Sequence, residues 1–204
     1  YTAFTPKIAL NYKFTPYLSI YTSYGLGFDS PAGNELDNYP TSSNQGKFYN
    51  PDLEAQKTKN FDLGMKGNLI FTSGLFNYLF FEGTFFNIMI DNEIVPFEVL
   101  GSVFYRNSAK TNRSGFELGA ETAILKAFTL KVAYTYSNFS YDTYAARVIK
   151  LDNSGNFVTE EKDFSGKVVP SVPKHNIYVS GSYQNNITED LTGFLKLSVS
   201  HISD

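Results

Sequence analysis

The feature that most constrains this chain is an alternation of apolar and polar residues that recurs in one segment after another. In VPKHNIYVSGSY (172–183), the odd positions from 175 onward carry His, Ile, Val, Gly and Tyr, and the even positions are mostly polar. A β-strand points successive side chains to opposite faces, so this pattern predicts a strand with one apolar and one polar face. The apolar face must meet either the interior of a soluble protein or lipid.

Eight segments of the chain predict strands. Six alternate clearly, near residues 7–14, 17–28, 61–69, 116–124, 128–137 and 174–183, and two noisier ones lie at about 75–90 and 191–202. Most run for about 10–13 residues, which exceeds the usual length in soluble sheets and fits a tilted membrane crossing.

The connections between these segments alternate in length. Four are short, at 14–17, 68–74, 124–128 and 184–190, and three are long and rich in Asn, Asp, Ser, Gly and Pro, at roughly 29–57, 91–110 and 142–171. Short turns on one side and long loops on the other are typical of an outer-membrane β-barrel. If the short turns face the periplasm, Tyr1 and Asp204 both lie on the outer side. We therefore expect residues 1–204 to be a partial β-barrel domain, taken from the middle of a larger barrel.

Composition excludes several other classes of protein. No run of 18 or more apolar residues is uninterrupted, so a spanning helix is not expected. The chain has no cysteine, which excludes disulfides and thiolate metal sites, and its net charge of −3 gives no reason to expect nucleic acid as a partner.

The face opposite the apolar one carries charged side chains that a dry core would not tolerate unpaired. We expect these residues to face the water-filled lumen of the barrel: Lys66, Glu117, Glu121, Lys131 and Lys174. A soluble antiparallel sheet with one solvated face explains the alternation equally well, but strand length and the sorting of loops favour the barrel.

Four passages carry a resemblance to a known family. They are YLSIYTSYGLGFDSP (17–31), YNPDLEAQKTKNFDLGMKG (49–67), NRSGFELGAE (112–121) and VVPSVPKHNIYVSGSY (168–183). In this order and spacing they resemble the barrel of TonB-dependent outer-membrane receptors of the siderophore-receptor type, within the C-terminal half of that barrel.

The resemblance implies an all-β fold, an antiparallel up-and-down transmembrane β-barrel segment of about eight strands out of about 22. It also implies the bacterial outer membrane as the location. The implied partners are outer-membrane lipid, a nutrient such as a ferric siderophore, an N-terminal plug domain and the TonB complex. The plug, its TonB-contacting box, the upstream strands and the last strands are absent from these residues.

No residue is expected to be catalytic, and no metal or cofactor is expected. His175 falls on the apolar face at a strand start, where an amphipathic ring suits the membrane interface, and Ser200 and His201 are neighbours that point to opposite faces. The segment LDNSGN (151–156) lacks the terminal bidentate Glu of a calcium loop and is interpreted as a hairpin turn. Gly64, Gly67, Gly119 and Gly181 lie inside strands and are interpreted as structural.

The long loops hold the best candidates for ligand binding, because aromatic faces and guanidinium groups suit a flat, anionic ligand. The candidates are Tyr39, Phe48, Tyr49, Phe104, Tyr105, Arg106, Tyr141, Tyr144 and Arg147. The alternative is that they pack the loops onto each other. Siderophore, haem, cobalamin and glycan all stay open as ligands.

Three other interpretations of the whole chain stay open at this point. The first is a small self-closed outer-membrane barrel that acts as an adhesin or structural module. The second is a soluble β-sandwich that binds carbohydrate, and the third is an outer-membrane enzyme. The sandwich would bury the apolar face against a second layer of the same chain.

Overall fold

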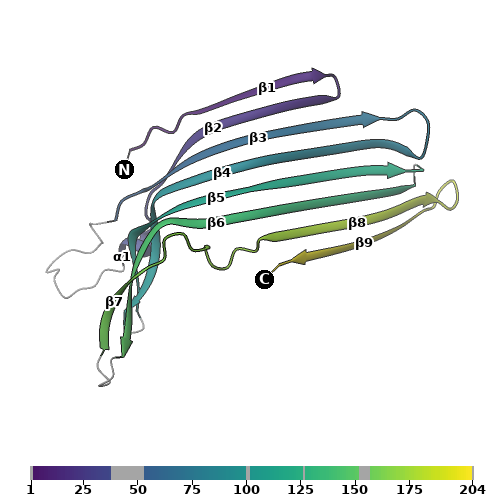
Figure 1. The fold of residues 1–204 in the computed structure, drawn as a ribbon. Coiled ribbons are helices and arrows are strands. Elements are labelled where there is room, and N and C mark those ends of the chain that lie inside the picture. Colours follow the sequence, from purple (N-terminus) through teal and green to yellow (C-terminus); the bar gives the residue numbers. More distant parts are fainter. Residues whose placement is uncertain (1, 38–52, 100–101, 126, 152–156, 204) are drawn as a thin grey trace.

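The computed structural model describes residues 2–37, 53–99, 102–125, 127–151 and 157–203. One antiparallel sheet contains the strands β1 (Lys7–Thr15), β2 (Leu18–Asp29), β3 (Gln56–Ile70), β4 (Phe76–Val99), β5 (Ser102–Ile124), β6 (Phe128–Leu151), β7 (Phe157–Asp163), β8 (His175–Asn186) and β9 (Thr192–Ile202), and a short helix α1 (Gly33–Asp37) follows β2. The strands pair in the order β1-β2-β3-β4-β5-β6-β8-β9, while β7 pairs with β6 alone (Figure 1).

All eight expected strands are present, and the short connections lie together at one end of the sheet (Figure 1). The β1–β2 turn is tight, with the Tyr17 amide donating to Thr15 Oγ1 at 3.1 Å. The turns that follow β3, β5 and β8 are also short, as the sequence predicted. The helix α1 and the paired outer ends of β6 and β7 lie at the opposite end (Figure 1).

Two of the three expected long loops are largely strand instead, and this prediction was wrong. Residues 91–99 and 102–110 extend β4 and β5, and 142–151 extends β6, which pairs with the unexpected strand β7. The alternation fades there because both faces meet the same medium, while backbone pairing continues without it. Leu151 pairs with Phe157, and residues 152–156, where a hairpin turn was predicted, lie outside the described residues.

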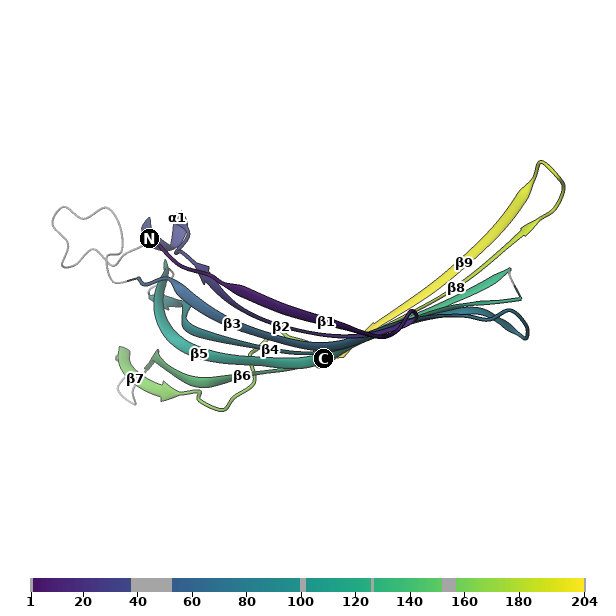
Figure 2. The same cartoon turned by 90° about the horizontal axis from the view of Figure 1, so that it is seen from above.

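The sheet is a single curved layer, without a second layer packed on it in the described ranges (Figure 2). Its apolar face is exposed: Leu118 on β5 retains 50% of its surface and Val199 on β9 retains 71%. The soluble-sandwich interpretation requires these side chains to be buried, so it is wrong. Among the described strands β1 and β9 each pair on one side only, so the sheet is also not a self-closed small barrel.

Most buried apolar side chains of the described residues lie where β4, β5 and β6 bend away from the main sheet, which we call the wall (Figure 1). They include Leu53, Ala55, Ile90, Val95 and Ala109. The one helix in the described residues, α1, is far too short to cross a membrane.

Candidate functional site

The polar face of the sheet carries a chain of hydrogen bonds and ion pairs. Glu121 on β5 is the register partner of Lys131 on β6, and their charged atoms lie 3.4 Å apart. The Tyr78 hydroxyl donates to the same Glu121 carboxylate at 2.8 Å. Further along this face, the hydroxyls of Tyr21 and Thr84 lie 2.6 Å apart.

The register places the residues expected in the lumen on this one face. Glu117 pairs with Thr84 and Thr135, Lys66 pairs with Glu82, and the Lys66 ammonium lies 5.8 Å from the Tyr21 ring centroid. Lys174 precedes β8, and its carbonyl accepts the Ser137 amide at 2.9 Å. These groups therefore form a polar strip that runs across the strands.

Where the strands leave the wall, a second polar cluster joins β3, β4 and β5. Two lysines contact Asp91 of β4: Lys110 of β5 at 3.1 Å and Lys59 of β3 at 3.3 Å. The hydrogen bond from Lys110, followed by that from Lys59, holds the pKa of the Asp91 carboxyl below its usual value despite partial burial. We call Asp91, Glu93, Asn107 and Arg113, with their partners, the rim cluster.

Arg113 anchors the other half of the rim cluster. Its guanidinium forms an ion pair with Glu93 and lies 5.8 Å from the Phe139 ring centroid on β6. Arg113 lies in NRSGFELGAE, one of the passages that resemble the family, but no sequence pattern predicted a role for Arg113 or singled out Glu93. Their pairing depends on a register shift between β4 and β5, which local sequence patterns do not reveal.

Two of the three candidates on β5, Phe104 and Arg106, form a small aromatic and cationic patch with Phe97 of β4. The Phe104 ring lies 5.8 Å from the Phe97 ring of β4, and the Arg106 guanidinium carbon lies 5.0 Å from that same Phe97 centroid. Arg106 also donates to the Ala145 carbonyl of β6 at 3.3 Å. Tyr105 pairs with Pro96, and its position between the other two candidates puts it on the opposite face of the sheet.

Two candidates, Tyr141 and Tyr144, lie on β6. Tyr144 directly precedes Ala145, whose carbonyl accepts the hydrogen bond from Arg106. The Tyr141 and Tyr144 rings are 4.7 Å apart, and Phe164 adds a third ring 5.5 Å from Tyr144. Burial raises the pKa of the Tyr141 phenol, and the charges at Tyr144 and Glu93 act in the same direction. The contact between Tyr144 and Phe164 joins β6 to the segment that follows β7.

Four of the nine candidates have little or no structural description. The backbone of Arg147 pairs with Glu161 in the β6–β7 hairpin. Tyr39, Phe48 and Tyr49 lie outside the described residues.

The two histidines lie on the apolar face at the same end of β8 and β9. His175 pairs with Tyr136, and its Nδ1 lies 2.8 Å from the Tyr134 hydroxyl. His201 pairs with Ile177 and Ser200 pairs with Tyr178, so this serine and histidine lie on opposite faces. No group of three or more His, Asp or Glu side chains in the described ranges is arranged to hold a metal ion.

The family model described as TonB dependent receptor-like, beta-barrel, matches residues 1–203. The chain belongs to the TonB-dependent receptor β-barrel family. Members of this family are bacterial outer-membrane proteins.

Three solved structures share the fold of this receptor wall. The ferric-catecholate import receptor Fiu from E. coli K12 is 19% identical, with a TM-score of 0.58 over 91% of the chain. The copper transporter OprC is 13% identical (TM-score 0.55, 93% of the chain), and the RagAB peptide importer is 16% identical (TM-score 0.55, 97% of the chain). The chain spans 23%, 32% and 29% of the respective structures.

Proposed function

We propose that these residues form part of the wall of a receptor that binds a ferric siderophore in its outer loops and imports it through a plug-gated barrel. The energy comes from the TonB complex, and the wall binds its ligand without catalysis. The family match over residues 1–203 carries the proposal as far as a receptor barrel. The proposed ligand class rests on the side chains of Phe97, Arg106, Tyr141 and Tyr144, which lie beyond the bend.

The patch on β4–β6 has the chemistry to recognise a flat anionic ligand. Arg106 offers a guanidinium over the Phe97 ring, and Tyr141 and Tyr144 offer two adjacent phenol rings one strand away. An aromatic catecholate chelate of iron is both flat and anionic, so ring stacking and charge can act on it together. Fiu, which imports ferric catecholates, gives this ligand class a precedent on the same fold.

The polar strip supports a water-filled lumen beside a plug domain. Glu121 and Lys131 remain partly exposed on that face, at 33% and 58% of their side-chain surface. Such charges are stable beside water or beside polar groups of a second domain. We propose that residues 1–204 are a partial barrel domain, with further wall strands paired along the open edges of β1 and β9.

The proposal is tested with the full-length receptor in its own bacterium. Deletion of the gene should slow growth under iron limitation and reduce uptake of a radiolabelled ferric tris-catecholate, and growth in iron-replete medium should be unchanged. Parallel uptake of copper and of a labelled peptide tests the substrates named for the other two solved structures, OprC and RagAB. Unchanged iron uptake in the deletion strain would contradict the proposal.

Point variants of the purified receptor test whether the β4–β6 patch binds the ligand. Arg106→Gln and Tyr144→Leu should each weaken binding of the ferric tris-catecholate to the purified receptor by about 1 kcal/mol, a few-fold in Kd. Lys196→Gln, on β9 at the opposite end of the sheet, is the matched control and should bind like wild type. Equal affinities for all three variants would exclude the β4–β6 patch from the site.

A further inference from the structure

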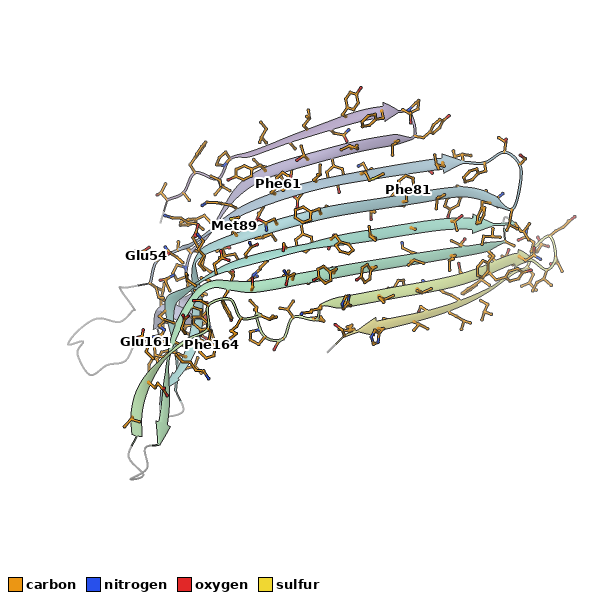
Figure 3. The ribbon with its side chains drawn as sticks, in the orientation of Figure 1. Glu54, Phe61, Phe81, Met89, Glu161 and Phe164 are labelled. Atoms are coloured by element: carbon orange, nitrogen blue, oxygen red, sulfur yellow. The ribbon has the colours of Figure 1, made fainter. Side chains whose placement is uncertain are left out.

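The paired strands β4 and β5 turn away from the wall at a defined point, and their outer parts carry the aromatic and cationic patch (Figures 1 and 3). The pairing register shifts between Ile90 and Glu93 and again between Glu93 and Ile94. Asn92 lies inside this irregularity with a φ of 60°, in the left-handed region that asparagine tolerates better than most residues. Such a bulge bends a strand, so the β4–β5 hairpin bends away from the wall at Asn92.

A single amide side chain ties this bend to the start of β3. Asn107 Oδ1 accepts the Glu54 amide hydrogen at 2.7 Å, and Asn107 Nδ2 donates to the Glu54 carbonyl at 2.8 Å. The same Nδ2 donates to the Asn92 carbonyl at 2.7 Å. Asn107 therefore pairs with both peptide groups of Glu54, as a neighbouring strand would, and also holds the bulge residue.

The partners of Asn107 are themselves fixed. Asn92 Nδ2 donates to Glu54 Oε2 at 2.8 Å, and the Ile94 amide donates to Gln56 Oε1 at 3.1 Å. Leu53 and Ala55, on either side of Glu54, are buried to 4% and 5% exposure. Because both neighbours are buried, the Glu54 backbone is packed on either side, and Asn107 holds the bend against it.

We propose that Asn107 is a positioning residue that holds the outer β4–β5 hairpin at one angle to the barrel wall, and thereby fixes Phe104 and Arg106 for ligand binding. Only an amide supplies one acceptor and two donors in this geometry. Aspartate has nearly the same shape but lacks both donors, so it would place a carboxylate against the Glu54 and Asn92 carbonyl oxygens. The effect on ligand binding rests on the proposed function, whereas the effect on the angle of the hairpin does not.

The test measures the angle of the hairpin directly in the full-length receptor in lipid. The 204 residues contain no cysteine, so spin labels can be attached at Val103→Cys on the hairpin and Leu63→Cys on the wall, with any cysteine elsewhere replaced by serine. Both positions are exposed, at 42% and 47%. Pulsed electron resonance then gives the distribution of distances between hairpin and wall.

We expect a narrow distance distribution for the wild-type background and a broad one for Asn107→Asp. If the binding-competent angle falls to about a tenth of the population, Kd for a ferric tris-catecholate rises about tenfold. Asn185→Asp, an exposed asparagine on β8 at the end with the short turns, is the matched control and should change neither measurement. A distribution as narrow in Asn107→Asp as in wild type would overturn the proposal.

The outcomes separate this inference from the proposed function. If wild type does not bind the ferric probe but Asn107→Asp still broadens the distribution, the siderophore assignment fails and the positioning role stands. If Asn107→Asp does not assemble in the membrane, Asn107→Gln replaces it, since its amide sits on a longer stem and misses the same partners. Broadening in Asn107→Gln then supports the role of Asn107, and a wild-type distribution overturns it.

Discussion

Lys131 and Glu121 face each other across β6 and β5 on the polar face, with 3.4 Å between Nζ and Oε2. Tyr78 donates a second hydrogen bond to the same carboxylate at 2.8 Å. The two charged side chains stay 58% and 33% exposed, so water competes with the pair. This exposure supports the proposed water-filled lumen on this face.

The exposure of this pair predicts a weak interaction. Lys131→Met, combined with Glu121→Gln in a double-mutant cycle, should give a coupling energy of at most about 1 kcal/mol in urea unfolding of the lipid-reconstituted receptor. A coupling energy of several kcal/mol would mean that the pair is dry, and would contradict a water-filled lumen on this face.

Adjacent residues on β5 should respond in opposite ways to charge. Leu118 lies on the exposed apolar face midway along the paired part of β5, and Glu117 lies on the polar face. Leu118→Arg should destabilise the membrane-inserted barrel by about 2–4 kcal/mol, because arginine near the bilayer midplane loses its hydration. Glu117→Arg, the matched control, should cost much less. The measurement is the unfolding midpoint in urea; equal shifts for both variants would argue against lipid on the Leu118 face.

The faces of the sheet were predictable from sequence because two media impose opposite demands on alternate positions. Glu117 and Leu118 illustrate this: one must suit water and the next must suit hydrocarbon. Beyond the bend, alternate positions are no longer divided between two media, so the sequence there does not alternate. For this reason β7 and the outer parts of β4 and β5 were predicted as loops. The pairing of Leu151 with Phe157 follows from backbone hydrogen bonding, which residue type specifies only weakly.

The rim cluster could not be predicted for a different reason. Asn107 and Glu54 are 53 positions apart in sequence, and no periodic pattern connects them. Glu54 lies in YNPDLEAQKTKNFDLGMKG, one of the passages that resemble the family. Its partners, however, depend on a bulge at Asn92, and the position of that bulge is set by the pairing register. A side-chain amide that pairs with a distant peptide leaves no signal in composition or alternation.

Glycines inside the strands should differ in their tolerance of a methyl group. A Cβ at Gly115 would lie 2.1 Å from the Tyr136 carbonyl oxygen, and one at Gly64 would lie 2.4 Å from the Tyr21 ring. One at Gly25 would meet only the Lys7 side chain, at 3.4 Å. Because a backbone carbonyl cannot rotate away, Gly115→Ala should be the most destabilising, at about 1–3 kcal/mol or more.

Gly64→Ala should be intermediate, since displacing Tyr21 also disturbs its 2.6 Å contact with Thr84. Gly25→Ala should be close to neutral and serves as the control. Urea midpoints of the three reconstituted variants check the order, and a Gly25 variant as unstable as the Gly115 variant would refute it.

The ion pairs of Asp91 should make the stability of the rim depend on pH. Lys110 and Lys59 lower the pKa of Asp91 below its ordinary value of 3.8 in the folded state. A lowered folded pKa stabilises the fold above the unfolded pKa, and this stabilisation is lost as the pH falls through the folded pKa. Asp91→Asn should therefore be less stable than wild type near neutral pH, and the gap should close as the pH falls below about 3.8. Urea unfolding of both proteins over this range measures the gap. Asp190→Asn, an exposed carboxylate in the β8–β9 turn, should show no such gap, and a gap at Asp91 that persists or widens in acid would show that its contribution is not ionic.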